Sequence, residues 1–269
     1  MSKRIILVTA LLLTFACTTT TTTTTSDNRL ETTPRHDEWV TIDSAGRPLH
    51  AYVVYPQASR KSGAVLVIHE NRGLTDWVRT VADKLAERGY IAIAPDLLSG
   101  TAPGGGRTSD FPTSDAAREA ISKLPPEQVL TDLANVAKYV RTLPSANGKL
   151  AVAGFCWGGG KTFAFANSGD DVSASFVFYG TGPRDDAGTA GIDGPVYGFY
   201  GGADERVNAT IEPTKAAMDK NGKKYDPVIY AGAGHAFMRL GEEANAEEAN
   251  KKAHDEAWTR WLSLLRAIE

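Results

Sequence analysis

Short apolar segments alternate with helical patterns through most of this chain, and this alternation restricts the fold more than any other feature. Residues 64–68 (AVLVI) and 91–94 (IAIA) contain no polar position, which is typical of strands buried on both faces of a sheet. A helical pattern over 75–87 separates them and predicts a βαβ unit with parallel strands. We therefore predict an α/β fold, a mostly parallel central sheet with helices on both faces. Further strands are predicted at 150–153, 174–179, 196–200 and 227–230, and an antiparallel pair at the sheet edge at 39–42 and 49–55.

Residues 1–16 have the layout of a secretory signal peptide. Lys3 and Arg4 precede an uncharged run that is too short to cross a bilayer as a helix. The junction TFAC at 14–17 resembles the lipobox of bacterial lipoproteins, in which the cysteine is lipidated, although a threonine stands where leucine is usual. We expect an exported protein of the periplasm or cell envelope that contacts the membrane only through a lipid on Cys17. Plain cleavage after Ala16 is the alternative.

The chain after this junction divides into a linker and one domain. Eight consecutive threonines at 18–25 begin a polar stretch without apolar periodicity, so residues 17–36 are predicted to form a disordered tether. Residues 37–269 are predicted to form a single domain. Within it, the segment SGTAPGGGR at 99–107 is too rich in glycine and proline for regular structure and is a candidate lid.

Composition excludes several classes of protein. A hydrophobic fraction of 42% with 23% charged residues indicates a folded globular chain. The 29 basic residues do not outnumber the 32 acidic ones, which argues against nucleic-acid binding. The two cysteines are Cys17 and Cys156, so a lipid on the first would prevent an intramolecular disulfide. Cys156 is then either an inert buried thiol or a functional one.

The strongest chemical motif is GFCWGG at residues 154–159, directly after the predicted strand LAVA. In α/β hydrolases a G-x-S-x-G sequence occupies such a strand-to-helix turn and exposes the nucleophile. Here Cys156 replaces the serine, and the start of the following helix would favour a thiolate. The alternatives are a tight turn in which the cysteine only packs, and a phosphate-binding loop. The second is disfavoured because Phe155 stands where that motif requires its first glycine.

A nucleophile of this kind needs a histidine base and a carboxylate that orients it. Asp204 follows the predicted strand 196–200, and His235 follows the strand 227–230. Both residues therefore lie just beyond the carboxyl ends of strands, where open α/β sheets place their sites. The order nucleophile, acid, histidine is also that of the α/β hydrolases.

The segment HENRG at 69–73 follows another buried strand and is the remaining candidate. The loop at this place supplies an oxyanion N–H in hydrolases of this class. We predict that Glu70 faces the thiol, and that the backbone N–H groups of Asn71 and Trp157 bind the oxyanion. For His69 we favour a structural role in fixing the loop, and Arg72 is a candidate substrate-binding residue.

Together these segments resemble the dienelactone hydrolase family, the carboxymethylenebutenolidase-like α/β hydrolases. The matching pieces are HENRG, APDLLSG (94–100), GFCWGG, YGGADERV (from Tyr200) and AGHAFMR (ending at Arg239). The resemblance implies a triad of Cys156, His235 and Asp204, with Glu70 as a fourth member that contacts the resting thiol. It also implies that Arg239 holds a substrate carboxylate.

One departure bears on the substrate. The family places a second carboxylate-binding arginine after the PDL segment, whereas residues 98–101 here read LSGT. Dienelactone itself is therefore in question. We expect hydrolysis of an ester or lactone through an acyl-cysteine, by a monomer without cofactor or metal. A non-catalytic, lipid-anchored binding protein with the same fold is the alternative, and a redox-active thiol is disfavoured because no C-x-x-C pair exists.

Overall fold

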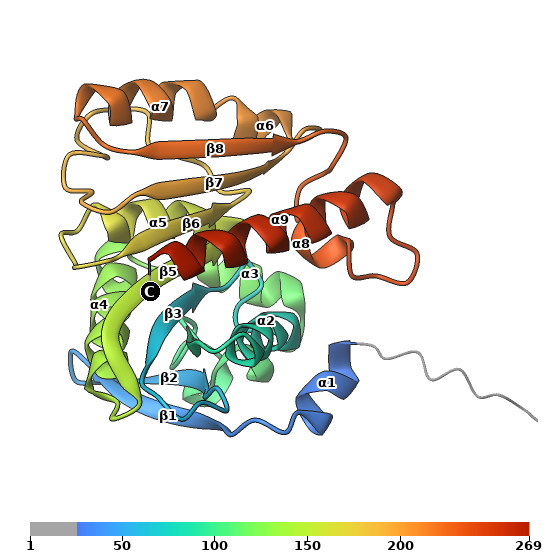
Figure 1. The fold of residues 1–269 in the computed structure, drawn as a ribbon. Coiled ribbons are helices and arrows are strands. Elements are labelled where there is room, and N and C mark those ends of the chain that lie inside the picture. Colours follow the sequence, from blue (N-terminus) through green and yellow to red (C-terminus); the bar gives the residue numbers. More distant parts are fainter. Residues whose placement is uncertain (1–25, 269) are drawn as a thin grey trace, which may run out of the picture.

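The computed structural model describes residues 26–268 as one sheet flanked by helices (Figure 1). The strands are β1 (Asp37–Ser44), β2 (Arg47–Val54), β3 (Ser62–Ile68), β4 (Ile91–Pro95), β5 (Ala146–Phe155), β6 (Ala174–Phe178), β7 (Val196–Gly201) and β8 (Tyr225–Tyr230). The helices are α1 (Ser26–Thr32), α2 (Asp76–Glu87), α3 (Ser114–Ser122), α4 (Pro126–Thr142), α5 (Trp157–Ala166), α6 (Glu205–Asn208), α7 (Ile211–Lys220), α8 (Phe237–Leu240) and α9 (Glu248–Ala267).

The sheet is mixed, with the order β1-β2-β4-β3-β5-β6-β7-β8. β2 pairs antiparallel with β1 and β4, and all other neighbours are parallel. The predicted fold class is thus confirmed. β3 and β4 are buried along their whole length, which explains why their sequences have no polar face.

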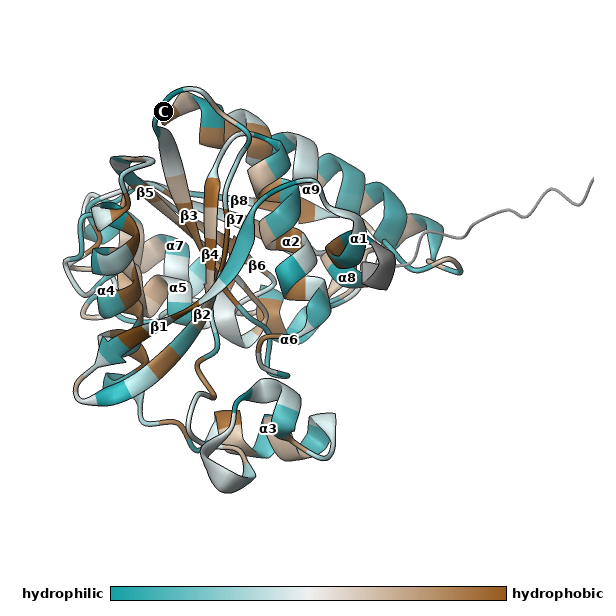
Figure 2. Ribbon diagram, turned by 90° about the horizontal axis from the view of Figure 1, so that it is seen from below, coloured by the Kyte–Doolittle hydropathy of each residue, from teal (hydrophilic) through white to brown (hydrophobic). Residues whose placement is uncertain are grey.

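Alternate residues of each central strand face different helical layers. Val65 and Val67 of β3 belong to a core with α2, α8 and α9, whereas Leu66 and Ile68 belong to a core with α4 and α5. Trp261 of α9 is fully buried against the aromatic rings on the first face. Figure 2 shows the apolar strands enclosed by helices, with α3 lying apart from both layers.

The elements on either side of Cys156 differ in extent from the predictions. β5 begins at Ala146 rather than at residue 150, and α5 begins at Trp157, directly after Cys156. The glycines at 158–160 predicted a turn because glycine disfavours helices. In the structure they are the first helical turn, held there by contacts with neighbouring strands.

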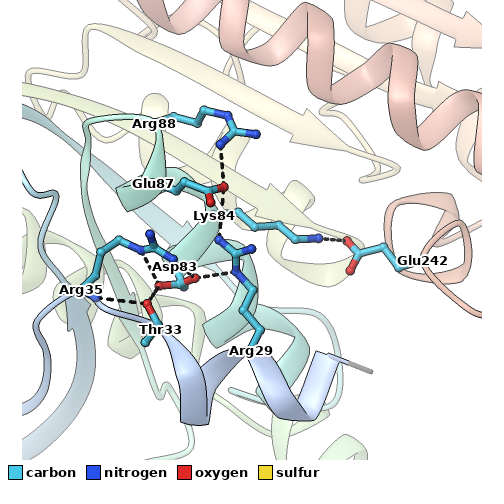
Figure 3. Close-up of polar contacts among 8 residues, drawn as sticks. All are labelled: Arg29, Thr33, Arg35, Asp83, Lys84, Glu87, Arg88 and Glu242. Carbon is cyan, nitrogen blue, oxygen red and sulfur yellow. Dashed lines mark hydrogen bonds and ion pairs between the residues drawn. The ribbon is translucent and has the colours of Figure 1, made fainter. Parts of the chain in front are cut away.

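The prediction of a disordered tether over 17–36 is wrong for its last part. α1 and the residues after it pack on α2 through Asp83, whose side chain is fully buried. The Asp83 carboxylate accepts hydrogen bonds from Arg29 Nε (2.5 Å), Thr33 Oγ1 (2.6 Å) and Arg35 Nε (2.7 Å), as Figure 3 shows. A buried carboxylate needs such partners, and Asp83 lies too far along the chain for a local pattern to reveal them. The predicted signal peptide and Cys17 lie outside the described residues.

Burial alone would raise the pKa of Asp83, but the hydrogen bonds from Arg35 and Thr33 and the nearby arginine charges lower it below its ordinary value. Asp83 is therefore an anion at neutral pH that ties the segment before β1 to the domain.

The segment after β4 is also tied down. It contains two short 3₁₀ turns, Pro103–Gly105 and Thr108–Asp110, and a bridge between Ala102 and Gly106. Thr108 donates through its N–H and its hydroxyl to Asp96, at 2.9 and 2.7 Å.

Among residues 26–268, no helix combines the length and the apolar character needed to span a membrane.

Candidate active site

Cys156 lies at the turn between β5 and α5 with a backbone conformation that side chains rarely adopt. Its φ is 55° and its ψ is −115°. Such a conformation costs free energy, because Cβ crowds the neighbouring carbonyl oxygen. The backbone N–H of Cys156 donates to the Phe178 carbonyl of β6 at 2.9 Å, which fixes the turn against the sheet.

The glycines of the motif are required by close backbone contacts. A Cβ on Gly154 would lie 2.2 Å from the Gly158 carbonyl oxygen, and one on Gly158 would lie 2.5 Å from the carbonyl oxygens of Ile68 and His69. A Cβ on Gly159 would meet Gly180 at 2.8 Å. The turn can therefore form only because glycines let the end of β3 and the residues after β6 approach it without side chains in between.

The structure brings Cys156, His235 and Asp204 into one hydrogen-bonded chain. Cys156 Sγ lies 3.1 Å from Nε2 of His235, and Nδ1 of His235 lies 2.5 Å from Oδ2 of Asp204. Asp204 follows β7, caps α6 and is buried, whereas His235 follows β8. This is the order of contacts that a nucleophile, a base and an orienting carboxylate need.

The surroundings favour a protonated His235. Burial disfavours the imidazolium, but the hydrogen bonds with Cys156 and Asp204 outweigh it and raise the pKa of His235 to about 9. The ring of Tyr179 packs edge-on against the imidazole, with centroids 5.1 Å apart. A charged histidine beside the sulfur stabilises a thiolate.

Glu70 lies in the same site but bonds to different partners from those that the family resemblance implies. Its Oε1 accepts from the Tyr179 hydroxyl at 3.3 Å and its Oε2 accepts from Arg239 Nε at 3.0 Å. Within residues 26–268 Glu70 makes no hydrogen bond with Cys156, whose sulfur bonds to His235 instead. The expected contact between glutamate and thiol is therefore absent in this arrangement.

The predicted oxyanion donors lie beside the thiol. Asn71, Cys156, Trp157 and Tyr179 line one cavity of about 390 Å³. The backbone N–H groups of Asn71 and Trp157 have no backbone acceptor in the described part of the chain. They remain free to bind a substrate oxygen.

The loop that carries Asn71 is held at both ends. His69 is fully buried, accepts at Nε2 from the Leu97 N–H at 3.4 Å, and stacks on Trp157 with centroids 5.5 Å apart. At the other end the Leu74 N–H donates to Thr108 Oγ1 at 3.0 Å. These contacts agree with the structural role predicted for His69.

The predicted substrate-binding arginines do not line this cavity. Arg239 is occupied by Glu70 and lies 3.6 Å from Glu243, while Arg72 is half-buried without an ion pair in the described chain. The cavity instead contains Arg118 of α3 and Arg206 of α6. Sequence reasoning missed both arginines, and also Tyr179, which directly follows the buried strand β6 at the same sheet edge as Cys156.

Comparison with known proteins identifies the family. The sequence profile of the dienelactone hydrolase family matches residues 49–269. The chain belongs to the dienelactone hydrolase family. It is therefore a carboxylic ester hydrolase that acts on ester or lactone bonds, as the motifs predict.

Relatives of the chain share most of its length. A protein from Methylorubrum extorquens, assigned as a carboxymethylenebutenolidase, is 33% identical over 202 residues, 70% of this chain and 67% of the relative. One from Salmonella typhimurium with the same assignment is 31% identical over 236 residues, 82% and 84% of the two chains. A crystal structure from Klebsiella pneumoniae, assigned as a dienelactone hydrolase, has a TM-score of 0.74 at 26% identity and covers 87% of this chain and 99% of its own.

We predict that Gly158→Ala destabilises the fold, whereas Gly160→Ala does not. The added methyl group at 158 meets two backbone carbonyl oxygens that cannot move independently of β3. We expect a loss of about 1–3 kcal/mol in the free energy of unfolding, as for other overpacked sites.

At Gly160 the nearest atom is 3.4 Å away, and alanine favours the helix by about 0.5–1 kcal/mol. Urea unfolding of both variants measures the difference. Equal stabilities would contradict the packing argument.

Proposed function

We propose that the protein hydrolyses its ester or lactone through a covalent acyl-cysteine at Cys156. The observation that carries this proposal is the chain of contacts from Cys156 Sγ to His235 at 3.1 Å and from His235 to Asp204 at 2.5 Å. A sulfur held beside a protonated imidazole is poised to attack a carbonyl carbon.

In the first half-reaction the Cys156 thiolate attacks the carbonyl carbon, and the carbonyl oxygen becomes an oxyanion. The N–H groups of Asn71 and Trp157 bind this oxyanion, which lowers the barrier because they are already oriented. The tetrahedral intermediate then collapses, and the carbon–oxygen bond to the alcohol breaks. His235 donates its proton to the departing alkoxide and leaves a thioester on Cys156.

In the second half-reaction neutral His235 takes a proton from water, and the resulting hydroxide attacks the thioester carbonyl. Collapse of the second intermediate releases the carboxylic acid and restores the thiolate beside the imidazolium. Asp204 keeps the imidazole oriented through both steps. In a lactone the leaving alkoxide belongs to the same molecule, so one hydroxy acid is released.

Glu70 and Arg239 complete the site as a separate ion pair. Arg239 neutralises the Glu70 carboxylate at 3.0 Å, and Tyr179 donates to its other oxygen. We propose that this pairing keeps the glutamate charge from opposing formation of the thiolate.

We further propose that the protein is exported and attached to the envelope by a lipid on Cys17. The support is the sequence before residue 18, where a short apolar run ends in TFAC.

Substitution of Cys156 tests the covalent mechanism. We predict that Cys156→Ala lowers kcat/KM on short chromogenic esters and simple lactones by about a thousandfold or more, because the nucleophile is lost. Cys156→Ser should retain a small fraction of the activity, since His235 can still activate the hydroxyl.

Mass spectrometry after a rapid quench should find the acyl group on Cys156 in the wild type only. Undiminished turnover by Cys156→Ala would exclude the cysteine mechanism. Inactivity of a folded wild type towards the whole panel would favour a binding protein.

The pH dependence follows from the raised pKa of His235. With this raised pKa the imidazolium persists through neutral pH and is lost as the pH rises through about 9. We predict that kcat/KM for an alkyl ester falls above about pH 9, because the alkoxide then lacks its proton donor.

In Asp204→Asn this alkaline limb should move to lower pH, since the carboxylate stabilises the imidazolium. A limb that stays in place would show that Asp204 does not set the pKa of His235.

The lipid anchor is tested on the full chain in a bacterial host. We predict that Cys17→Ser moves the protein from the detergent-extracted membrane fraction to the soluble periplasmic fraction. Cys156→Ala is the matched control, because it removes the other thiol and should stay in the membrane fraction. Wild-type protein without a diacylglyceryl mass on Cys17 would contradict the anchor.

A further inference from the structure

Two arginines from separate elements line the same cavity as the thiol. Arg118 comes from α3, which lies apart from the helical layers in Figure 2, and Arg206 comes from α6. Apart from Cys156, the other residues that line the cavity in the described part of the chain have neutral side chains, and none carries a carboxylate. The space in front of Cys156 is therefore positively charged.

One face of α3 lines the cavity. Arg118, Ile121 and Ser122 all line it, and their spacing of three and four residues places them on one helical face. Ile121 and Ala117 are also buried against Leu98, which fixes the helix on the domain. The base of the Arg118 side chain is thus held in place while its guanidinium lies at the surface.

The backbone around Arg206 is equally fixed. Asp204 accepts from the Val207 N–H at 3.4 Å, and Asn208 Nδ2 donates to the Gly201 carbonyl at 2.9 Å. The residue that orients His235 therefore also caps the turn that carries Arg206. A ligand held by Arg206 has a defined position relative to the catalytic residues.

The charges of these arginines are available to a ligand. Arg118 pairs with Asp115 at 2.9 Å, but the Asp115 side chain is 83% exposed, and such surface pairs are weak. Arg206 makes no ion pair with any residue between 26 and 268. By contrast, Arg239 already forms ion pairs with the carboxylates of Glu70 and Glu243.

We infer that Arg118 and Arg206 form an anion subsite that selects esters or lactones carrying a carboxylate away from the scissile carbonyl. This inference rests on the proposed acyl-cysteine mechanism, which places that carbonyl at Cys156. The arginine pair binds the charged end of the substrate near α3 and α6, and Arg239 remains the partner of Glu70. A cavity of about 390 Å³ fits a small monoacid ester of this kind.

Two pairs of esters of matched size test the subsite. Mono(4-nitrophenyl) glutarate and 4-nitrophenyl valerate differ in a carboxylate on the acyl side, and 4-acetoxybenzoate and 4-methylphenyl acetate differ in one on the alcohol side. We predict that the wild type has a higher kcat/KM for the charged member of at least one pair. The pair that shows it identifies the side of the ester that faces the arginines.

In Arg118→Gln and in Arg206→Gln the kcat/KM for the charged ester should fall by about threefold to fivefold. In the double variant it should fall by about tenfold or more. The neutral ester should stay within about twofold, since neither arginine contacts the reacting atoms. The wild-type preference should also shrink as salt is raised from about 0.05 to 0.5 M, and the double variant should lose this salt dependence.

Lys123→Gln is the matched control. Lys123 is an exposed cation at the end of α3, paired with Glu119, and it does not belong to the residues that line the cavity. The variant should keep the wild-type preference. Thermal unfolding verifies that all variants are folded.

The subsite is overturned if the double variant keeps the charge preference, if the wild type shows none in either pair, or if Lys123→Gln loses as much as the arginine variants. In each of these cases neutral esters are still hydrolysed and the proposed function stands. Absence of turnover on all four esters contradicts the proposed function, and the subsite with it.

Discussion

The unusual backbone of Cys156 is the constraint on which the rest of the site depends. A positive φ at a residue with a side chain is unfavourable, so surrounding structure must hold it. Here the holding contacts come from β6, through the Phe178 carbonyl, and from glycines that let β3 and Gly180 touch the first turn of α5. The same contacts that impose the turn also bring the ends of β3, β5 and β6 together. The position of Cys156 and the convergence of the loops around it therefore depend on the same contacts.

The buried charges of the site are divided into two independent pairs. Asp204 pairs with His235, and Glu70 pairs with Arg239. Tyr179 contacts His235 of the first pair and Glu70 of the second. Burial raises the pKa of Tyr179 well above its ordinary value, so the hydroxyl stays neutral and can donate. Since each carboxylate has its own cation, neither opposes a negative charge on the sulfur. The division accounts for a site that holds two carboxylates close to a thiol, one of which, Asp204, helps to raise the pKa of His235.

The clustering of Cys156, Asp204 and His235 could be predicted from sequence because each follows a predicted strand, and parallel strands end at one edge of a sheet. The order of Cys156, Asp204 and His235 along the chain then matched the order of nucleophile, acid and histidine in α/β hydrolases. Residues placed by tertiary contacts were not accessible in this way. Arg206 lies in a four-residue helix, and Arg118 is placed by the packing of Ala117 and Ile121 of α3 on Leu98. The local sequence of α3 does not show that this packing brings Arg118 to the cavity beside Cys156. Asp83 looked like an ordinary helix residue because its partners are about fifty positions away.

The attachment of the N-terminal segment to α2 limits how far the domain can move from an anchored end. Arg29 is the first residue with a contact to Asp83, and only about a dozen residues separate it from Cys17. Even a fully extended chain of that length spans about 40 Å, which is comparable to the diameter of the domain itself. With a lipid on Cys17, the enzyme would stay within a thin layer at the envelope surface. The volume that the enzyme can reach would then scale with the area of the envelope rather than with the volume of the compartment.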